Sequence, residues 1–173
     1  IDEILKNEKV SLSGKEYDRI ITTPNDGYKI VKLCDISEII PGKPITKKDL
    51  IDNGKYKVIG GGISIMGYID KYNTYENTIT IAKTGSAGWV DFHKEKIFIT
   101  NNCLSLKVTN CQLNQYLYYI LKCSYYIISK TINTTSQPNI NTNLIKKIEF
   151  PVPESDEKIQ EWTEKISKPY NDY

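Results

Sequence analysis

Short apolar runs that alternate with polar residues fill the middle of the chain. The clearest is Thr78-Ile79-Thr80-Ile81, where every second side chain is apolar, as in a strand with one buried face. Similar runs recur between turn-forming residues, and we expect each of them to be a strand. They span residues 30–33, 56–59, 63–69, 78–81, 89–92, 97–99, 104–106 and 147–152.

The period of the pattern changes after Asn110. Leu113, Leu117 and Leu121 recur at helical spacing, and Asn110 is suited to cap the first turn, so we expect a helix over about 111–129. Residues 131–143 are almost entirely polar and are expected to form a loop.

Both ends of the chain also carry helix signals. Acidic residues at 154–157 suit a helix start, and an apolar stripe follows at Ile159, Trp162 and Ile166. Residues 1–21 read as a short helix with a polar connection, and the turn formers of 22–28 mark a boundary. The pattern as a whole predicts an α+β fold: a twisted, mixed, mostly antiparallel sheet of short strands with a packed helix and terminal connector helices.

Composition narrows the class of protein. The chain has 173 residues, of which 39% are hydrophobic and 25% charged, as in ordinary globular domains. No apolar run approaches the roughly 20 residues that span a bilayer, and no secretory signal opens the sequence, so we expect a cytoplasmic protein without a membrane partner. Because the first residue is Ile1, we expect the chain to be a piece of a longer polypeptide.

Charge does not by itself point to nucleic acid, since the net charge is only +2. Local clusters of charged and polar residues would therefore have to indicate a nucleic-acid interface. Arg19 is the single arginine, so any reading of bases falls mainly to Asn, Gln, Ser, Thr and Lys side chains.

Catalytic and metal-binding signatures are missing from the sequence. The four cysteines form no C-x-x-C pair, and we expect no zinc site, no other cofactor and reduced thiols. His93 is expected on a surface loop rather than in a catalytic role. The glycines of 60–62, with Gly67, fit three interpretations: a structural turn, a nucleotide site, or a loop that lets backbone approach a DNA phosphate.

Five segments then follow one another in a telling order. They are 28–43 (YKIVKLCDISEIIPGK), 56–72 (YKVIGGGISIMGYIDKY), 78–90 (TITIAKTGSAGWV), 98–106 (FITNNCLSL) and 136–153 (SQPNINTNLIKKIEFPVP). Together they resemble the target-recognition domain of type I restriction–modification DNA specificity subunits. On this resemblance, residues 1–27 are the N-terminal helix and linker, 28–153 the target-recognition domain, and 154–173 the start of a connector helix.

The resemblance implies a module that reads one half of a split double-stranded DNA target and has no catalysis of its own. Its expected partners are duplex DNA, a methyltransferase subunit or fused methyltransferase domain that modifies adenine, and a second recognition domain or another copy of the chain. The resemblance also implies that the module directs a nuclease to the same DNA target.

Candidate DNA contacts fall into three groups. The basic group beside a Pro-Gly turn suits phosphates, the glycine-bounded turns allow close approach, and the amide and hydroxyl side chains offer donors and acceptors to base edges. The amides have an alternative role in capping backbone and shaping loops, above all in Gln137-Pro138-Asn139. In the family that these segments resemble, Arg often occupies the position of Lys83. The predicted contacts are Lys43, Lys47, Lys48, Gly61, Lys83, Thr84, Ser86, Asn101, Asn102, Ser136, Gln137 and Asn139.

Two other functional classes stay open at this point. One is a catalytic fragment of a fused methyltransferase–nuclease, although the methyltransferase hallmark of Asn or Asp, two prolines and an aromatic is missing, and Glu95-Lys96 has no evident nuclease partner. The other is a protein- or glycan-binding module that uses the 13 tyrosines of the chain.

Overall fold

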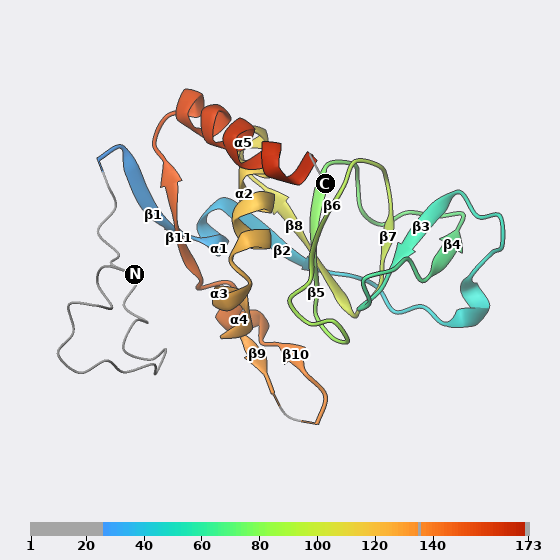
Figure 1. Cartoon of the computed structure of the whole chain (residues 1–173). Helices are drawn as coiled ribbons and strands as arrows, with labels where there is room; N and C mark the ends of the chain where they lie inside the picture. Colours follow the sequence, from blue (N-terminus) through green and yellow to red (C-terminus); the bar gives the residue numbers. More distant parts are fainter. Residues whose placement is uncertain (1–25, 135, 172–173) are drawn as a thin grey trace.

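The computed structural model describes residues 26–134 and 136–171 (Figure 1). The helix and polar connection expected over 1–21 lie outside the described residues. The elements, in chain order, are β1 (Tyr28–Lys32), α1 (Leu33–Ile36), β2 (Ser37–Pro41), the 3-10 turn η2 (Lys47–Asp49), β3 (Tyr56–Ile59), β4 (Gly67–Ile69), β5 (Thr78–Ala82), β6 (Val90–His93), β7 (Phe98–Ile99), β8 (Cys103–Val108), α2 (Cys111–Cys123), α3 (Tyr125–Ser129), β9 (Ile132–Asn133), β10 (Asn139–Ile140), α4 (Thr142–Ile145), β11 (Glu149–Pro153) and α5 (Asp156–Asn171).

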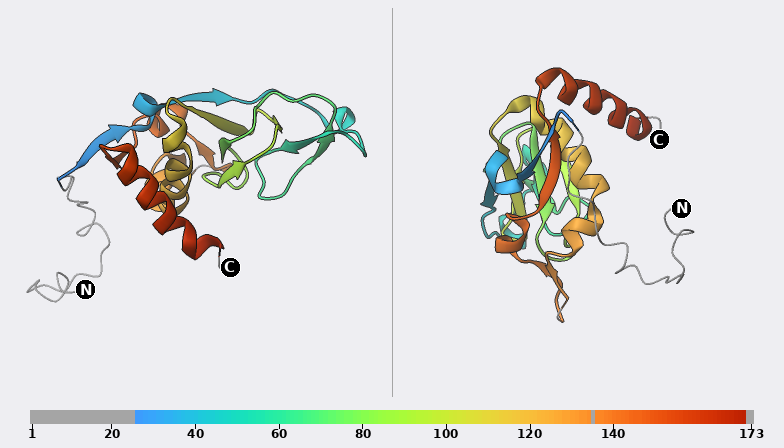
Figure 2. Two further views of the ribbon diagram at one scale, coloured as in Figure 1. Left: turned by 90° about the horizontal axis from the view of Figure 1, so that it is seen from above. Right: turned by 90° about the vertical axis from the view of Figure 1, so that its left-hand side faces the viewer.

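The main sheet has four antiparallel strands in the order β2-β8-β5-β6. Its alternation gives it two different faces. Ile79 and Ile81 of β5 pair with Leu106 and Leu104 of β8, and all four side chains are buried in the main hydrophobic core. Helix α2 covers this face, as the right-hand view of Figure 2 shows. The other face is polar at its centre, where Thr80 lies opposite Ser105.

A second, smaller sheet has the strand order β4-β3-β7 and extends the molecule away from the helices (Figure 2, left). It has its own small core of Val58, Ile69 and Phe98. Strand β3 pairs antiparallel with β4 and parallel with β7. Another cluster, which includes Ile99 and Cys103, joins the two sheets. The predicted α+β class with mostly antiparallel short strands is therefore confirmed.

The first and last strands of the described chain lie side by side. Strands β1 and β11 pair antiparallel from Tyr28↔Pro153 to Lys32↔Glu149, and Glu154 N–H donates to the Gly27 carbonyl at 3.0 Å. Helix α5 then packs back with Ile159 buried in the main core. Among the helices of the described ranges, none is both long and apolar enough to cross a membrane.

The helix predicted over 111–129 is divided in two. Helix α2 ends at Cys123, and Ser124 leaves the helical conformation with φ −96° and ψ 34° before α3 begins. The reason lies in packing, because α3 closes over Gly88, where a Cβ would meet Ile128 at 3.2 Å. The break turns Ile128 into the core at 0% exposure.

Other boundaries also differ from the sequence prediction. The strand expected over 63–69 is confined to Gly67–Ile69, and residues 131–143 are more than a loop, since they hold β9, β10 and α4. Strand β2 was not predicted, because its sequence Ser-Glu-Ile-Ile-Pro does not alternate and its pairing comes from β8. Pro151, expected to end a strand, lies inside β11, where an edge position tolerates the missing donor.

We expect Leu117→Ala to lower the free energy of unfolding by about 2–5 kcal/mol, because it removes a side chain with 0% exposure from the α2–sheet contact. Gln115→Ala on the exposed side of the same helix is the matched control and should change little. Urea unfolding of both variants measures the difference. Equal effects would contradict the packing of α2 on the sheet.

Candidate nucleic-acid interface

Most of the predicted contact residues gather at one end of the main sheet. Strands β2 and β5 end there, β6 and β8 begin there, and the tip of the β9–β10 hairpin reaches the same side, at the bottom of Figure 1. We call the set the polar edge. It consists of Lys43, Gly61, Lys83, Thr84, Ser86, Asn101, Asn102, Ser136, Gln137 and Asn139.

Main-chain hydrogen bonds join the loops of the polar edge to one another. Asn101 N–H donates to the Lys43 carbonyl at 3.2 Å, and Lys83 N–H donates to the Asn102 carbonyl at 2.8 Å. Ile140 N–H donates to the Lys83 carbonyl at 2.8 Å and ties in the β9–β10 hairpin. Segments far apart in sequence are therefore held in a fixed relation without using any side chain of the edge.

Glycines allow two of these loops to touch. Ser86 N–H donates to the Gly61 carbonyl at 2.7 Å, and a Cβ on Gly61 would lie 2.3 Å from the Thr84 carbonyl oxygen. Gly85, between Thr84 and Ser86, has a positive φ of 73°, which favours glycine. Of the three interpretations of the glycine cluster, a structural turn accounts for these contacts directly.

The amide side chains of the edge divide into two kinds. In the described part of the chain, Asn101, Asn102 and Gln137 are exposed and make no side-chain hydrogen bond. Asn139 instead donates its Nδ2 to the Gln137 carbonyl at 3.2 Å and shapes the hairpin. Three amides thus have their donors and acceptors available, and the fourth stabilises the loop that carries one of them.

Positive charge dominates the edge. Lys43 is exposed and Lys83 half-buried, and the loops that carry the edge, residues 83–89, 100–102 and 136–139, contain no Asp or Glu. A local positive surface therefore exists on a chain whose net charge is only +2.

The structure does not bring Lys47 and Lys48 to the polar edge. They lie on η2, beside β4 at the outer end of the small sheet, where Ile51 N–H donates to the Tyr68 carbonyl at 2.9 Å. Backbone and side-chain hydrogen bonds from Thr46 lower the pKa of Asp49, which keeps a carboxylate next to these two lysines. The basic group predicted from sequence is thus divided between two places.

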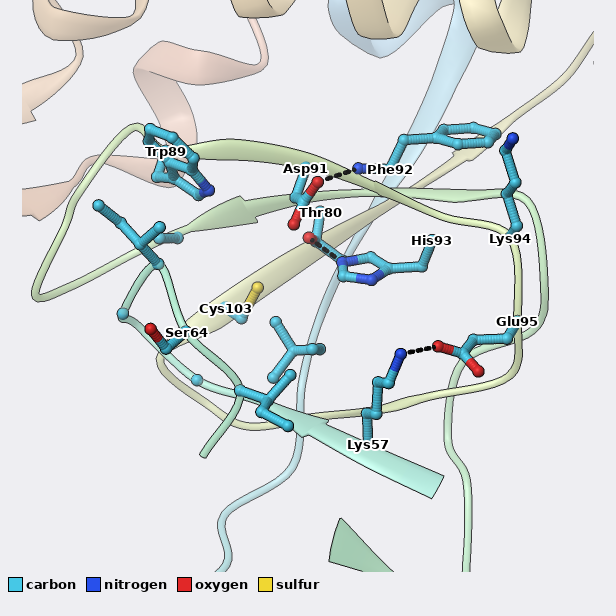
Figure 3. Close-up of a pocket in the computed structure, with 16 residues that line it drawn as sticks. Lys57, Ser64, Thr80, Trp89, Asp91, Phe92, His93, Lys94, Glu95 and Cys103 are labelled. Atoms are coloured by element: carbon cyan, nitrogen blue, oxygen red, sulfur yellow. Dashed lines mark hydrogen bonds and ion pairs between the residues drawn. The ribbon is translucent and has the colours of Figure 1, made fainter. Parts of the chain in front are cut away.

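A hollow of about 330 Å³ lies next to the edge, between the β3–β4 loop and the polar face of the main sheet (Figure 3). Thr80, Asp91 and His93 form its floor, and the His93 Nε2 lies 2.8 Å from the Thr80 hydroxyl. At its rim, Lys57 Nζ and a Glu95 carboxylate oxygen are 2.5 Å apart.

His93 corrects the sequence prediction, because it ends strand β6 and is half-buried instead of lying on a surface loop. Burial lowers its pKa, while Asp91 and Glu95 oppose that shift, so the imidazole is neutral at pH 7. Burial also raises the pKa of the neighbouring Cys103 thiol to about 12, which keeps it protonated. The alternation of β5 could have predicted this polar face from the sequence, since it places the Thr80 side chain on the face of the sheet away from Ile79 and Ile81.

Tyrosines form a separate cluster on the small sheet. The ring of Tyr72 lies 5.2 Å from Tyr56 and 5.5 Å from Tyr75, and Lys96 Nζ is 4.8 Å from the centre of the Tyr72 ring. These contacts join side chains on the small sheet and the loops next to it, and the cluster lies apart from the polar edge.

Comparison with known proteins adds sequence relatives to this geometry. A family model described as the type I restriction modification DNA specificity domain matches residues 25–170. A type I specificity subunit from Mycoplasma pneumoniae is 33% identical over 139 residues, which cover 76% of this chain and 37% of the relative. One from Mycoplasma genitalium is 30% identical over 112 residues, covering 64% and 29%. The chain thus spans about a third of the length of these relatives.

Solved structures share the fold. The S subunit of a type I restriction-modification system from M. genitalium matches with a TM-score of 0.75 at 22% identity, over 86% of this chain and 40% of that one. The HsdS subunit from Thermoanaerobacter tengcongensis matches with a TM-score of 0.66 at 14% identity, over 90% and 41%.

We expect Gly61→Ala to lower the free energy of unfolding by about 1–3 kcal/mol, because the added methyl group would overlap the Thr84 carbonyl. Gly62→Ala is the matched control, since its Cβ would have no neighbour nearer than 3.9 Å. Chemical denaturation of the two variants measures the contrast. If both substitutions were neutral, the loops would not be in contact.

His93 predicts a specific acid sensitivity. Its pKa is lowered in the folded state, so its stabilising contribution is complete above the ordinary value of 6.5 and is lost as the pH falls through the folded-state pKa. His93→Gln removes this titration. The difference in unfolding free energy between wild type and variant should therefore shrink between neutral pH and about pH 5, as measured by urea unfolding across pH. A constant difference would show that the imidazole pKa is unshifted.

Proposed function

The chain belongs to the type I restriction–modification DNA specificity family, and on that premise we propose that it recognises a sequence in double-stranded DNA through the polar edge. The observation that carries the proposal is that Asn101, Asn102 and Gln137 are exposed, with no side-chain hydrogen bond to any described residue, on loops fixed by main-chain hydrogen bonds. An amide side chain can bind adenine with two hydrogen bonds in the major groove. Fixed loops lower the entropy lost when such contacts form.

The lysines and the glycine turns have a different part in the proposal. Lys43 and Lys83 lie on either side of Asn101 and Asn102 in the hydrogen-bonded network, where they would bind phosphates and set the register of the duplex. Gly61, Thr84 and Ser86 would allow close approach of the backbone. Lys47 and Lys48, at the far end of the small sheet, would bind phosphates of flanking DNA.

We further propose that residues 28–153 are one recognition domain of a longer protein, with α5 as the start of a connector helix. Support comes from the pairing of Tyr28 with Pro153, which closes the domain at both ends of that range. It also comes from the relatives, since the chain covers 29% and 37% of two of them.

Recognition without catalysis is the role that we assign to this chain. Methyl transfer to adenine would fall to a methyltransferase subunit or fused domain, and any cleavage to a nuclease of the same system. A second recognition domain, or a second copy of this chain, would read the other half of the target. Such an assembly would work in the cytoplasm, where its DNA lies.

Selection of bound sequences from a randomised duplex pool tests the proposal directly. The full chain should enrich one short motif, and its affinity should fall with salt at a log–log slope of about −0.9 per neutralised phosphate. Asn102→Ala should cost about 1–3 kcal/mol on the selected duplex and little on a scrambled one. Lys43→Ala should weaken binding to both and flatten the slope, because a phosphate contact carries no sequence information.

Gln115→Ala, on the exposed side of α2, serves as the control and should bind as wild type does. Equal losses on selected and scrambled duplexes would deny Asn102 a reading role. A pool without enrichment, bound with no dependence on salt, would contradict DNA recognition as a whole.

A further inference from the structure

The β3–β4 loop, Gly60–Met66, presents apolar side chains to solvent beside the polar edge. Ile63 is 61% exposed, Ile65 43% and Met66 39%. The sequence from Val58 to Ile69 contains no charged residue. Exposed aliphatic side chains that gather on one loop, next to a polar surface, usually mark a contact with another molecule.

The loop is held at both of its ends and not at its tip. Gly61 accepts the hydrogen bond from Ser86 N–H at 2.7 Å, and Met66 N–H donates to the Val58 carbonyl at 2.8 Å. Between these anchors, Ile63 and Ile65 border the hollow of Figure 3 and belong to none of the hydrophobic clusters of the described residues. We call these two residues the apolar tip.

We infer that the apolar tip inserts between stacked base pairs when a duplex occupies the polar edge, and that it unstacks one step of the DNA. The inference rests on the proposed function. Aliphatic side chains are the usual wedges in proteins that kink DNA, because they replace the base surface that unstacking exposes. Two isoleucines beside a cradle of amides and lysines match that chemistry.

The place of the apolar tip, next to the polar edge, is the reason for assigning duplex DNA as its binding partner. The turn that anchors the loop carries Thr84 and Ser86, so DNA seated against these residues is adjacent to the tip. Because the loop has no charged side chain, insertion would leave no ion desolvated. The anchors fix the loop in advance and reduce the entropy lost on insertion.

A wedge also supplies specificity that direct contacts lack. The chain has a single arginine, Arg19, so the side chain that reads guanine best is scarce in it. Steps differ in how easily they unstack, and pyrimidine–purine steps open most readily. A tip that must open one step would favour targets with a flexible step at that position, without a hydrogen bond to either base.

The test uses the full chain and the duplex recovered by pool selection, with the fluorescent adenine analogue 2-aminopurine placed in turn along the site. Wild type should raise the fluorescence at one step and bring dyes at the two duplex ends closer together. The double variant Ile63→Ser, Ile65→Ser should lose both signals and keep the salt slope. Ile51→Ser is the matched control, since Ile51 is 43% exposed but follows η2 on the small sheet.

A mismatch at the responsive step provides a second measurement, because it removes stacking in advance. Wild type should bind the mismatched duplex about tenfold more tightly than the paired one, since part of the unstacking cost is already met. The double variant should show little gain. Thermal melting of the two serine variants establishes that each remains folded, as expected for exposed positions.

Each remaining result overturns the inference in a distinguishable way. Wild-type binding to the selected duplex without unstacking or bending would leave DNA recognition intact and remove the wedge. An unchanged signal in the double variant, with loss of binding to a methyltransferase subunit, would make the tip a protein contact. Failure of wild type to bind any duplex would contradict the proposed function and the wedge together.

Discussion

Hydrogen bonds between main chains at one end of the main sheet are the constraint on which the rest of the molecule depends. They connect Lys43 to Asn101, Lys83 to Asn102 and Gly61 to Ser86, although these residues are spread from position 43 to position 102 of the sequence. Because backbone supplies these bonds, side chains at Asn101 and Asn102 contribute little to the fold. The side chains of these loops can therefore change while the geometry of the loops is retained.

The alternation of a few strands serves two purposes at once. In β5, Ile79 and Ile81 bury the contact with α2, and Thr80 between them faces the small sheet with a hydrogen bond to His93. In β8, Ser105 likewise donates to the Ile40 carbonyl at 3.3 Å. A polar face that is satisfied by its own partners lets a second sheet pack on it, and that sheet carries the loop with the apolar tip.

Sequence reasoning succeeded where the signal is local. The period of two in Thr78–Ile81 and the helical spacing of Leu113 and Leu117 were enough to predict β5 and α2. It failed where structure comes from distant partners. Strand β2 exists because β8 pairs with it, and the residues expected to form one polar loop over 131–143 include the β9–β10 hairpin that is tied to Lys83. The candidate site followed the same rule: motif order identified the loops, whereas only the fold separates Lys47 from Lys43.

The pairing of β1 with β11 has an evolutionary consequence. The β1–β11 ladder and the hydrogen bond from Glu154 N–H to the Gly27 carbonyl bring the two ends of residues 27–154 next to each other. A segment whose two ends lie together can be exchanged by recombination for another of different length or sequence without moving the points at which it joins the rest of its polypeptide. Such an exchange would replace all the loops of the polar edge in one step, without stepwise mutation.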